Sequence, residues 1–427
     1  MLHSLKLWFL AFVFLSVIVI ASSSQTFVSG GHVGKLPTTV YFSDFKQDGI
    51  SDWEVIDIAI GYLSRVNNKK LIIDEDITVD RAILLPSDFT LELEADIYQA
   101  DNTFDNVIRS ANVVFDENEV AQVPTLSISS RAYVPISYPE NIEHLSNIRI
   151  VGNNHKIFAS KQVPSAFHPF NGAEEPMIGD DWGSRGMTIA FTNCDNIEIA
   201  DLEIRDAHCY SICFDLCKKV HVHDISIYSP VNVDAELDGV DIRTGCFDFL
   251  IENIYAETGD DSIAINSGAH PATKYPVKKR YLYPIEGGYR MWPSLPAEAF
   301  NVNNIVVKNV LCKRVDVDGR GALILSNFGH EISDIVFENF IEPEGSLRTP
   351  DDTVILIYGG KDYVEDSIHD VVINNIKATE AGKVVTVRCK CNNVWLSNLQ
   401  PKPDGVATSI AFPLGVIDID IKRTTGH

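Results

Sequence analysis

The stretch DNIEIADLEI, residues 195–204, alternates polar and apolar side chains in two short runs, and an Asn or Asp stands at the start of each run. A similar phrase recurs along the chain. Its other copies are SNIRIVGNN (146–154), KKVHVHDISI (218–227), FDFLIENIYA (247–256), NNIVVKNVLC (303–312), SDIVFENFIE (333–342), HDVVINNIKA (369–378) and NNVWLSNLQP (392–401). Alternation of this kind predicts short strands with one buried face.

The spacing of these copies predicts how the strands are arranged. Their first central apolar residues fall at positions 148, 197, 220, 249, 305, 335, 371 and 394, so successive gaps are 49, 23, 29, 56, 30, 36 and 23 residues. A period of 23–30 with two intervals near double is typical of stacked coils, some of which carry long insertions. We therefore predict an all-β chain folded as a single-stranded, right-handed parallel β-helix. A β-sandwich is the alternative, but it does not require near-regular repetition.

One helix is predicted near the start of the coil, in SDWEVIDIAIGYL (51–63). Capping residues open this segment, and its apolar positions follow a helical pattern. They are Val55, Ile56, Ile58, Ile60 and Leu63. We expect this short helix to cap the N-terminal end of the solenoid.

Two insertions interrupt the repeat, at residues 160–186 and 269–300, and both are rich in Pro, Gly and aromatic residues. Loops of this length in a compact domain are usually functional or disordered. Their aromatic side chains, among them Trp292, would suit the walls of a sugar cleft. They could equally pin the loops to the coil.

The net charge and the N-terminal sequence limit the possible partners and the cellular compartment of the protein. The chain of 427 residues has 35 Lys and Arg against 59 Asp and Glu, a net charge of −24, which disfavours nucleic acid and anionic lipid as partners. Residues 7–21, LWFLAFVFLSVIVIA, are apolar over a length shorter than the roughly 20 residues that span a bilayer. We predict a signal peptide at 1–24 and one mature domain at 25–427. The mature protein should be soluble, monomeric and secreted, periplasmic or at the cell surface.

The eight cysteines include a cluster with a neighbouring histidine: His208, Cys209, Cys213 and Cys217. A four-residue spacing would suit a metal site on one helix face. The surrounding alternation predicts a strand instead, which would scatter the thiols. We therefore expect buried or disulfide-bonded cysteines rather than a metal site.

The acidic residues Asp238, Asp260 and Asp261 are the candidate catalytic residues. Asp238 precedes Asp260 by 22 residues, one coil of the predicted solenoid, so the three carboxylates should meet on one face. Like charges held close raise the pKa of one member, which places an acid beside bases. Glycoside hydrolysis uses that combination. A calcium site, or a ladder of aspartates capped by turn amides, is the structural alternative.

The segment ELDGVDIRTGCFDFLIENIYAETGDDSIAINSG (236–268) resembles the signature region of the polygalacturonases, glycoside hydrolase family 28, whose pattern is Asn-Thr-Asp-Gly-(Ile/Val)-Asp and, one turn later, Gly-Asp-Asp-Cys-Ile-Ala-Ile. DFTLELEADIYQA (88–100) and DAHCYSICFDLCKKVHVHDISIYSP (206–230) resemble other parts of that family. The resemblance implies the pectin-lyase-like β-helix and no metal or organic cofactor.

Carried over by motif, the resemblance makes Asp260 the general acid, with Asp238 and Asp261 holding and deprotonating the attacking water. It implies inversion, with carboxyls roughly 6.5–9.5 Å apart. The substrate would be a polygalacturonan-type chain, or another acidic or galactose-containing polysaccharide. The sequence does not distinguish attack at chain ends from attack inside the chain.

Three departures from the family pattern concern the substrate more than the reaction. Glu236-Leu237 stands in place of Asn-Thr. Gly319-Arg320-Gly321 stands in place of Gly-His-Gly, with His330 as a second candidate for the histidine. Only Tyr358 and Lys361 are offered where the family has Arg-Ile-Lys.

The candidate substrate-binding residues follow from these departures and from the neighbouring motifs. They are Arg320, Asp241, Arg243, Tyr358, Lys361, His208 and Trp292. Arg320 and Arg243 could bind a carboxylate or sulfate, or could simply neutralise the acidic cluster. Two other functions stay open: a polysaccharide lyase on the same fold, which would need a base and usually calcium, and a carbohydrate-binding β-helix without turnover.

Overall fold

The computed structural model describes residues 37–101, 103, 105–113, 143–160, 187–207, 209–229, 237–267, 297–315, 319–327, 329–347, 352–360, 363–410 and 419–420. These residues, apart from Pro37, lie in one compact unit, Thr38–His427. The predicted signal peptide and nearly all of both insertions lie outside the described residues. Within the described part, no helix has the length and apolar character that crossing a membrane requires.

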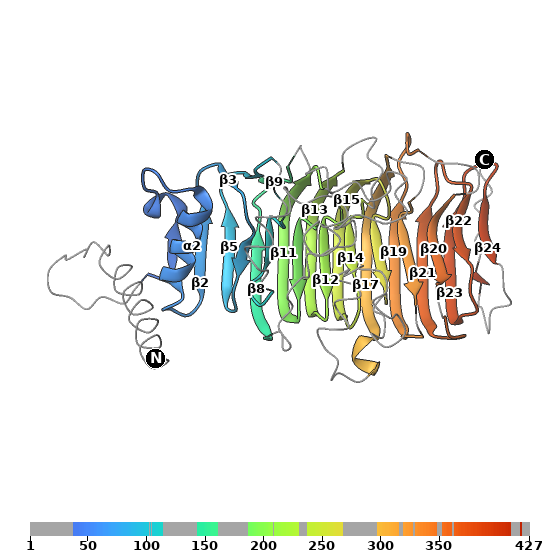
Figure 1. Cartoon of the computed structure of the whole chain (residues 1–427). Coiled ribbons are helices and arrows are strands. Elements are labelled where there is room, and N and C mark those ends of the chain that lie inside the picture. The colour runs from blue at the N-terminus through green and yellow to red at the C-terminus, as the bar shows by residue number, and fades with distance from the viewer. Residues whose placement is uncertain are drawn as a thin grey trace, which may run out of the picture. The chain divides into compact units, whose positions relative to one another are not determined.

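Two parallel sheets wind together through this unit (Figure 1). The larger sheet contains β1 (Thr39–Tyr41), β2 (Lys69–Ile73), β3 (Ile77–Val79), β5 (Phe89–Leu93), β6 (Ile97–Gln99), β8 (Leu145–Val151), β9 (Lys156–Phe158), β11 (Cys194–Arg205), β13 (Lys218–Tyr228), β15 (Phe247–Thr258), β17 (Val302–Arg314), β19 (Ile332–Ile341), β21 (Ile368–Lys377), β23 (Asn392–Gln400) and β25 (Ile419–Asp420). The smaller sheet contains β4 (Ile83–Leu85), β7 (Ile108–Ser110), β10 (Ile189–Thr192), β12 (Ile212–Asp215), β14 (Val240–Ile242), β16 (Ile263–Asn266), β18 (Ala322–Ser326), β20 (Thr353–Gly359), β22 (Lys383–Val387) and β24 (Val406–Ile410).

The register confirms the repeat that the sequence predicts. All eight positions named from the phrase, 148 through 394, pair with one another in consecutive order along the larger sheet. Each interval, including those of 49 and 56 residues, is therefore one coil, and the two long coils contain the two insertions. The fold is a right-handed parallel β-helix, as predicted.

An Asn or Asp recurs in the phrase because the backbone turns there into the left-handed region. Asn196, for example, has φ 54°, and Asn147 one coil earlier has φ 60°. Asn and Asp tolerate this conformation better than other residues that carry a Cβ. The side chains also stack, because Asn196 Nδ2 donates to Asn147 Oδ1 over 2.7 Å. Lys219, at φ 54°, is the one copy in the phrase that departs from Asn or Asp.

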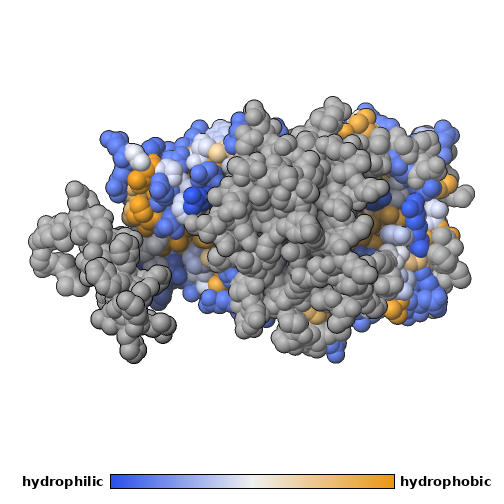
Figure 2. All heavy atoms as spheres, viewed as in Figure 1, coloured by the Kyte–Doolittle hydropathy of each residue, from blue (hydrophilic) through white to orange (hydrophobic). Residues whose placement is uncertain are grey.

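Between the two sheets lies one continuous core of Ile, Val, Leu and Phe side chains, with Cys194, Cys217 and Cys246 in equivalent positions of three coils. All eight cysteines are buried and none forms a disulfide. Cys217 belongs to this core, whereas Cys209 and Cys213 lie in a second, separate apolar cluster. The three thiols are thus divided between two clusters, and Cys209 and Cys213 share one of them; His208 lies outside the described residues. The described surface in Figure 2 is mostly hydrophilic, with scattered apolar residues.

The predicted N-terminal helix is present as α2 (Asp52–Leu63), which follows the 3₁₀ helix η1 (Phe42–Phe45). The Ser51 side chain accepts from the Glu54 N–H at the start of α2, and Glu54 Oε2 accepts from the Ser51 N–H over 2.7 Å. This reciprocal pair is a capping box. One apolar position of the helix lies outside its buried face: Ile58 is 43% exposed, while Ala59 is fully buried with Val55, Ile56 and Leu63. Positions 55, 56, 59 and 63 share one helical face, and position 58 does not.

Candidate active site

The acidic residues meet beside the smaller sheet because its register aligns them. Val240, Ile263 and Ala322 pair across β14, β16 and β18. The residues two positions earlier, Asp238, Asp261 and Arg320, are therefore in equivalent positions of three consecutive coils. The backbone continues the ladder here, since Gly239 N donates to Asp261 O over 2.8 Å and Ser262 N to Arg320 O over 2.9 Å.

The three predicted carboxylates form one cluster. A carboxylate oxygen from each of Asp238, Asp260 and Asp261 lies within 4.8 Å of the others. Asp238 Oδ1 also accepts from the Asp261 N–H over 2.7 Å, which ties the two coils together. The exposed fraction distinguishes the members: 24% of the Asp260 side chain is exposed, against 3% of Asp261. Asp260 is thus the member of the pair that an external molecule can reach.

Arg320 supplies a positive charge at the same place. Its Nη1 lies 3.6 Å from Asp261 Oδ1 and 3.9 Å from Asp260 Oδ1, and 30% of its side chain is exposed. Burial lowers the pKa of Arg320, but Asp261, Asp260 and Asp238 raise it by more. The guanidinium is therefore fixed as a cation, with donors left for a further acidic group.

One carboxyl of the cluster has a pKa close to neutral pH. Burial raises the pKa of Asp261 to about 7, and the charge of Asp260 acts in the same direction. Arg320 and Arg314 partly offset both effects. Two neighbouring carboxyls of this kind titrate as a pair. A carboxyl with a raised pKa beside further carboxylates is the combination that general acid and base chemistry requires.

The backbone of the Gly-Asp-Asp turn is held by two hydrogen bonds. Two donors meet the carbonyl oxygen of Asp260: Arg314 Nη1 over 2.7 Å and Thr258 Oγ1 over 3.0 Å. Arg314 is fully buried at the end of β17. Sequence reasoning missed this residue, because LCKRVDVDG (311–319) reads as an exposed, charged strand end and contains no motif.

Asp241 and Arg243 follow Asp238 closely in sequence, but their side chains do not belong to the aspartate cluster. Asp241 is 1% exposed and pairs in register with Cys213 and Ala264 on the outer face of the smaller sheet. Arg243 is 4% exposed, and its Nε lies 3.2 Å from Asp215 Oδ1. The structure therefore places Arg243 in a buried ion pair instead of beside the three aspartates.

The remaining predicted residues are dispersed or not described. Tyr358 is 41% exposed and pairs with Leu325, and its strand lies three coils beyond the strand of Asp241. His330 is 6% exposed and packs against Phe300, with ring centroids 5.7 Å apart. Arg320, and not His330, therefore occupies the position beside the acids. Lys361, His208 and Trp292 lie outside the described residues.

Among the described residues, the aspartate cluster is also the one group of three or more His, Cys, Asp or Glu side chains close enough to hold a metal ion. Oxygen donors of this type suit Ca²⁺. Arg320 and Arg314 already supply positive charge here, which works against a second cation. The geometry therefore favours acid and base chemistry over cation binding.

Comparison with known proteins identifies the family that this segment resembles. Residues 180–281 match Glycosyl hydrolases family 28, a stretch that includes all three aspartates. Polygalacturonase QRT2 of Arabidopsis thaliana is 28% identical over 81 residues, 19% of this chain and 18% of that protein. A probable polygalacturonase of the same plant is 31% identical over 94 residues, 21% of this chain and 20% of that protein. The matches thus span about a fifth of the relatives' length, and they confirm the polygalacturonase-like motifs.

The fold is shared over a much longer stretch. The hyperthermoactive exopolygalacturonase of Thermotoga maritima superposes with a TM-score of 0.50 over 90% of this chain and 91% of its own, at 17% identity. At this identity the likeness concerns the fold alone. It agrees with the right-handed parallel β-helix that the repeat predicts and with the parallel register of its strands.

Proposed function

We propose that the protein is an exported glycoside hydrolase that cleaves an acidic polysaccharide of the pectic type, or an oligosaccharide of it. The observation that carries this proposal is the cluster of Asp238, Asp260 and Asp261, in which burial raises the pKa of Asp261 to about 7. The family match over residues 180–281 supports the same reaction.

In the proposed reaction, Asp260 protonates the leaving glycosidic oxygen. Asp260 and Asp261 share the retained proton as a coupled pair, and Asp260 is the member whose side chain a substrate can reach. Asp238 and Asp261 hold a water molecule and remove its proton as that water attacks the anomeric carbon. The proton taken from water replaces the one that Asp260 donates. No other reactant is required.

The stereochemistry is proposed as inversion, on the resemblance to the family and on the presence of three carboxylates instead of two. The separation itself differs from expectation. One oxygen from each carboxylate lies within 4.8 Å of the others, which is a shorter approach than the roughly 6.5–9.5 Å between whole carboxyl groups that is typical of an inverting pair. The configuration of the first product by NMR decides: a retained anomer would reject inversion but leave hydrolysis standing.

The substrate assignment rests on Arg320. Its guanidinium lies at the mouth of the cluster, fixed as a cation and partly exposed, where it can pair with a uronate carboxylate or a sulfate ester. We propose an acidic sugar in the adjoining subsite for this reason. Export through a signal peptide at 1–24 is part of the proposal, and N-terminal sequencing of protein recovered outside the cell tests it.

The decisive experiment screens purified protein against pectic and algal polysaccharides and measures new reducing ends. Asp260→Asn should abolish their release, at least about 10³-fold, since both the proton and the donor are lost. Asp334→Asn is the matched control: Asp334 is exposed, has φ 56°, and lies at a position where Asn is common. Undiminished turnover by Asp260→Asn refutes the assignment. An unsaturated product that absorbs in the ultraviolet indicates a lyase, and binding without turnover indicates a carbohydrate-binding β-helix.

A further inference from the structure

Arg314 is fully buried and contacts the backbone of the proposed catalytic pair. It belongs to no motif in the sequence. It is the largest side chain of the described part that is fully buried. A buried arginine requires partners for its donors and its charge. One of these partners is the carbonyl oxygen of Asp260, which accepts from Arg314 Nη1 over 2.7 Å.

The neighbours of Arg314 fix the same peptide group and the Arg314 backbone. Thr258, paired with Arg314 in register between β15 and β17, donates its hydroxyl to the same carbonyl over 3.0 Å. The Arg314 main chain is held as well, since its carbonyl accepts from Leu347 N over 3.0 Å. The peptide that joins the two aspartates is thus fixed from two sides.

Gly319 provides the space for this contact. A Cβ at position 319 would lie 1.4 Å from Arg314 Nη1 and 2.2 Å from the Asp260 carbonyl carbon. The second of these atoms belongs to the backbone and cannot rotate away. The glycine that precedes Arg320 is therefore required for close packing of three elements: the strand end that bears Arg314, the Gly-Asp-Asp turn, and the turn that bears Arg320.

We infer that Arg314 is a positioning residue for the proposed hydrolysis, which holds the Asp260 peptide and places a fixed positive charge under the acid pair. This inference rests on the proposed function for its link to turnover. Every charged group known to face Asp261 bears on the same proton: Asp238 and Asp260 as anions, Arg320 and Arg314 as cations. Arg320 is partly exposed to substrate, whereas Arg314 is not.

The charge of Arg314 predicts a pH effect that a purely structural role would not produce. Because Arg314 lowers the pKa of Asp261, its removal should raise the pKa at which the pair loses its proton. In Arg314→Met the basic limb of the kcat/KM profile should therefore move up by about one pH unit, and kcat should fall at least about tenfold with KM nearly unchanged. Arg314→Lys retains the charge, so its limb should stay at the wild-type position.

A measurement independent of turnover separates this inference from the proposed function. Infrared titration of the protonated carboxyl band follows the pair in the substrate-free protein, and Asp261→Asn identifies the band. Arg314→Met should shift this titration upward, and Arg388→Met, at an exposed arginine, should not. A shifted band in a protein that cleaves no polysaccharide upholds the charge coupling between Arg314 and the acid pair, and rejects the hydrolase proposal together with the positioning role in turnover.

Two outcomes overturn the inference. One is a folded Arg314→Met protein with wild-type kcat and an unshifted titration. If that variant does not fold, Gly319→Ala decides, because it keeps the charge and displaces the guanidinium and the Asp260 peptide. A folded Gly319→Ala protein with at least about tenfold lower kcat supports the positioning role, and wild-type kcat in it contradicts that role.

Discussion

At the scale of single residues, the proton held by Asp261 links the reaction to the stability of the fold. Burial raises its pKa to about 7 in the folded protein, against roughly 3.9 in an unfolded chain. Between these two values the folded protein binds more protons than the unfolded one. Stability conferred by the protonated carboxyl is therefore present at low pH and is lost as pH rises toward 7.

This predicts that Asp261→Asn stabilises the protein above pH 7, by up to a few kcal/mol, while it removes activity. The amide keeps the shape of the side chain but never acquires the buried charge. Urea unfolding at pH 4, 6 and 8 measures the effect, with Asp334→Asn as control. Equal loss of stability in wild type and Asp261→Asn between pH 4 and 8 would contradict the role of this carboxyl.

The sequence predicted that the three aspartates lie together, as they do, but it offered no sign of Arg314, and the reason is physical. Asp238 and Asp261 are 23 residues apart, and any period in that range brings them together. Arg314 and Asp260 are 54 residues apart across a long insertion, and their contact is between a side chain and a main-chain carbonyl. Because a carbonyl leaves no trace in the sequence, only the folded backbone reveals this bond.

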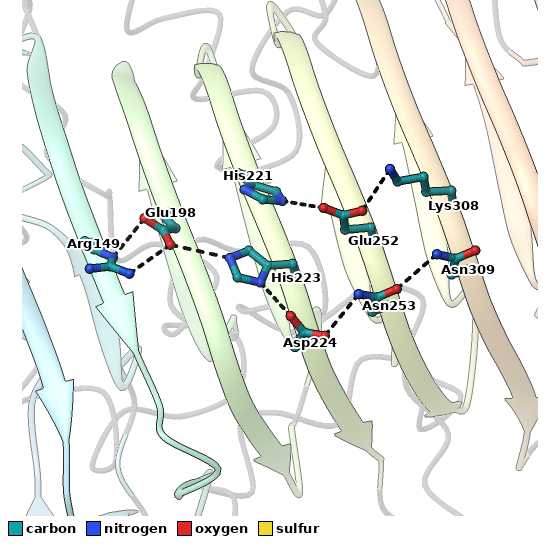
Figure 3. A network of polar contacts seen from close by, with 9 residues as sticks. All are labelled: Arg149, Glu198, His221, His223, Asp224, Glu252, Asn253, Lys308 and Asn309. Carbon is teal, nitrogen blue, oxygen red and sulfur yellow. Dashed lines mark hydrogen bonds and ion pairs between the residues drawn. The ribbon is translucent and has the colours of Figure 1, made fainter.

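At the scale of elements, the coil is maintained by polar ladders as well as by its core. Figure 3 shows two such rows on the larger sheet. In one, Asn309 Nδ2 donates to Asn253 Oδ1 over 3.0 Å, and Asn253 Nδ2 donates to Asp224 Oδ1 over 3.1 Å. In the other, Glu252 lies 2.9 Å from both His221 and Lys308. The recurrent Asn/Asp of the sequence is therefore a stacking device and a turn former at once.

Two substitutions of Asn309 separate the contribution of the side-chain ladder from that of the left-handed backbone. It has φ 59°, donates to Asn253, and accepts from Asn339 over 2.9 Å. Asn309→Gly should lose the ladder bonds alone, at a cost of about 1–2 kcal/mol. Asn309→Ala should lose about 1 kcal/mol more, since a Cβ disfavours this backbone conformation. Urea unfolding of both variants measures the difference, and equal stability would show that backbone strain contributes nothing.

The same ladders explain why the fold was more predictable than its details. Each coil repeats a phrase with a left-handed Asn or Asp, so position 197 could be aligned with 148 and 220 from sequence alone. The helix α2 offers no repeat, and the list of its apolar residues does not tell which of them are buried. The exposure of Ile58 shows that helical phase, rather than side-chain type, decides burial at that position.

At the scale of the whole molecule, the net charge of −24 opposes the proposed acidic substrate. The two effects act over different distances. The field of the whole chain extends over about 30 Å at 0.01 M salt and only about 8 Å at 0.15 M. The contact with Arg320, by contrast, is made within the site, where salt screens it less. Long-range repulsion should dominate at low salt, and local attraction at physiological salt.

We therefore expect kcat/KM for an acidic oligosaccharide to rise as salt increases from about 0.01 to 0.15 M, because the repulsion that slows encounter is screened first. A neutral analogue should show no such rise. Arg320→Gln removes the local attraction, so it should lower kcat/KM for the acidic substrate at every salt concentration and leave the rise in place. A steady decrease with salt in the wild type would mean that local positive charge, and not the acidic surface, governs the approach of the substrate.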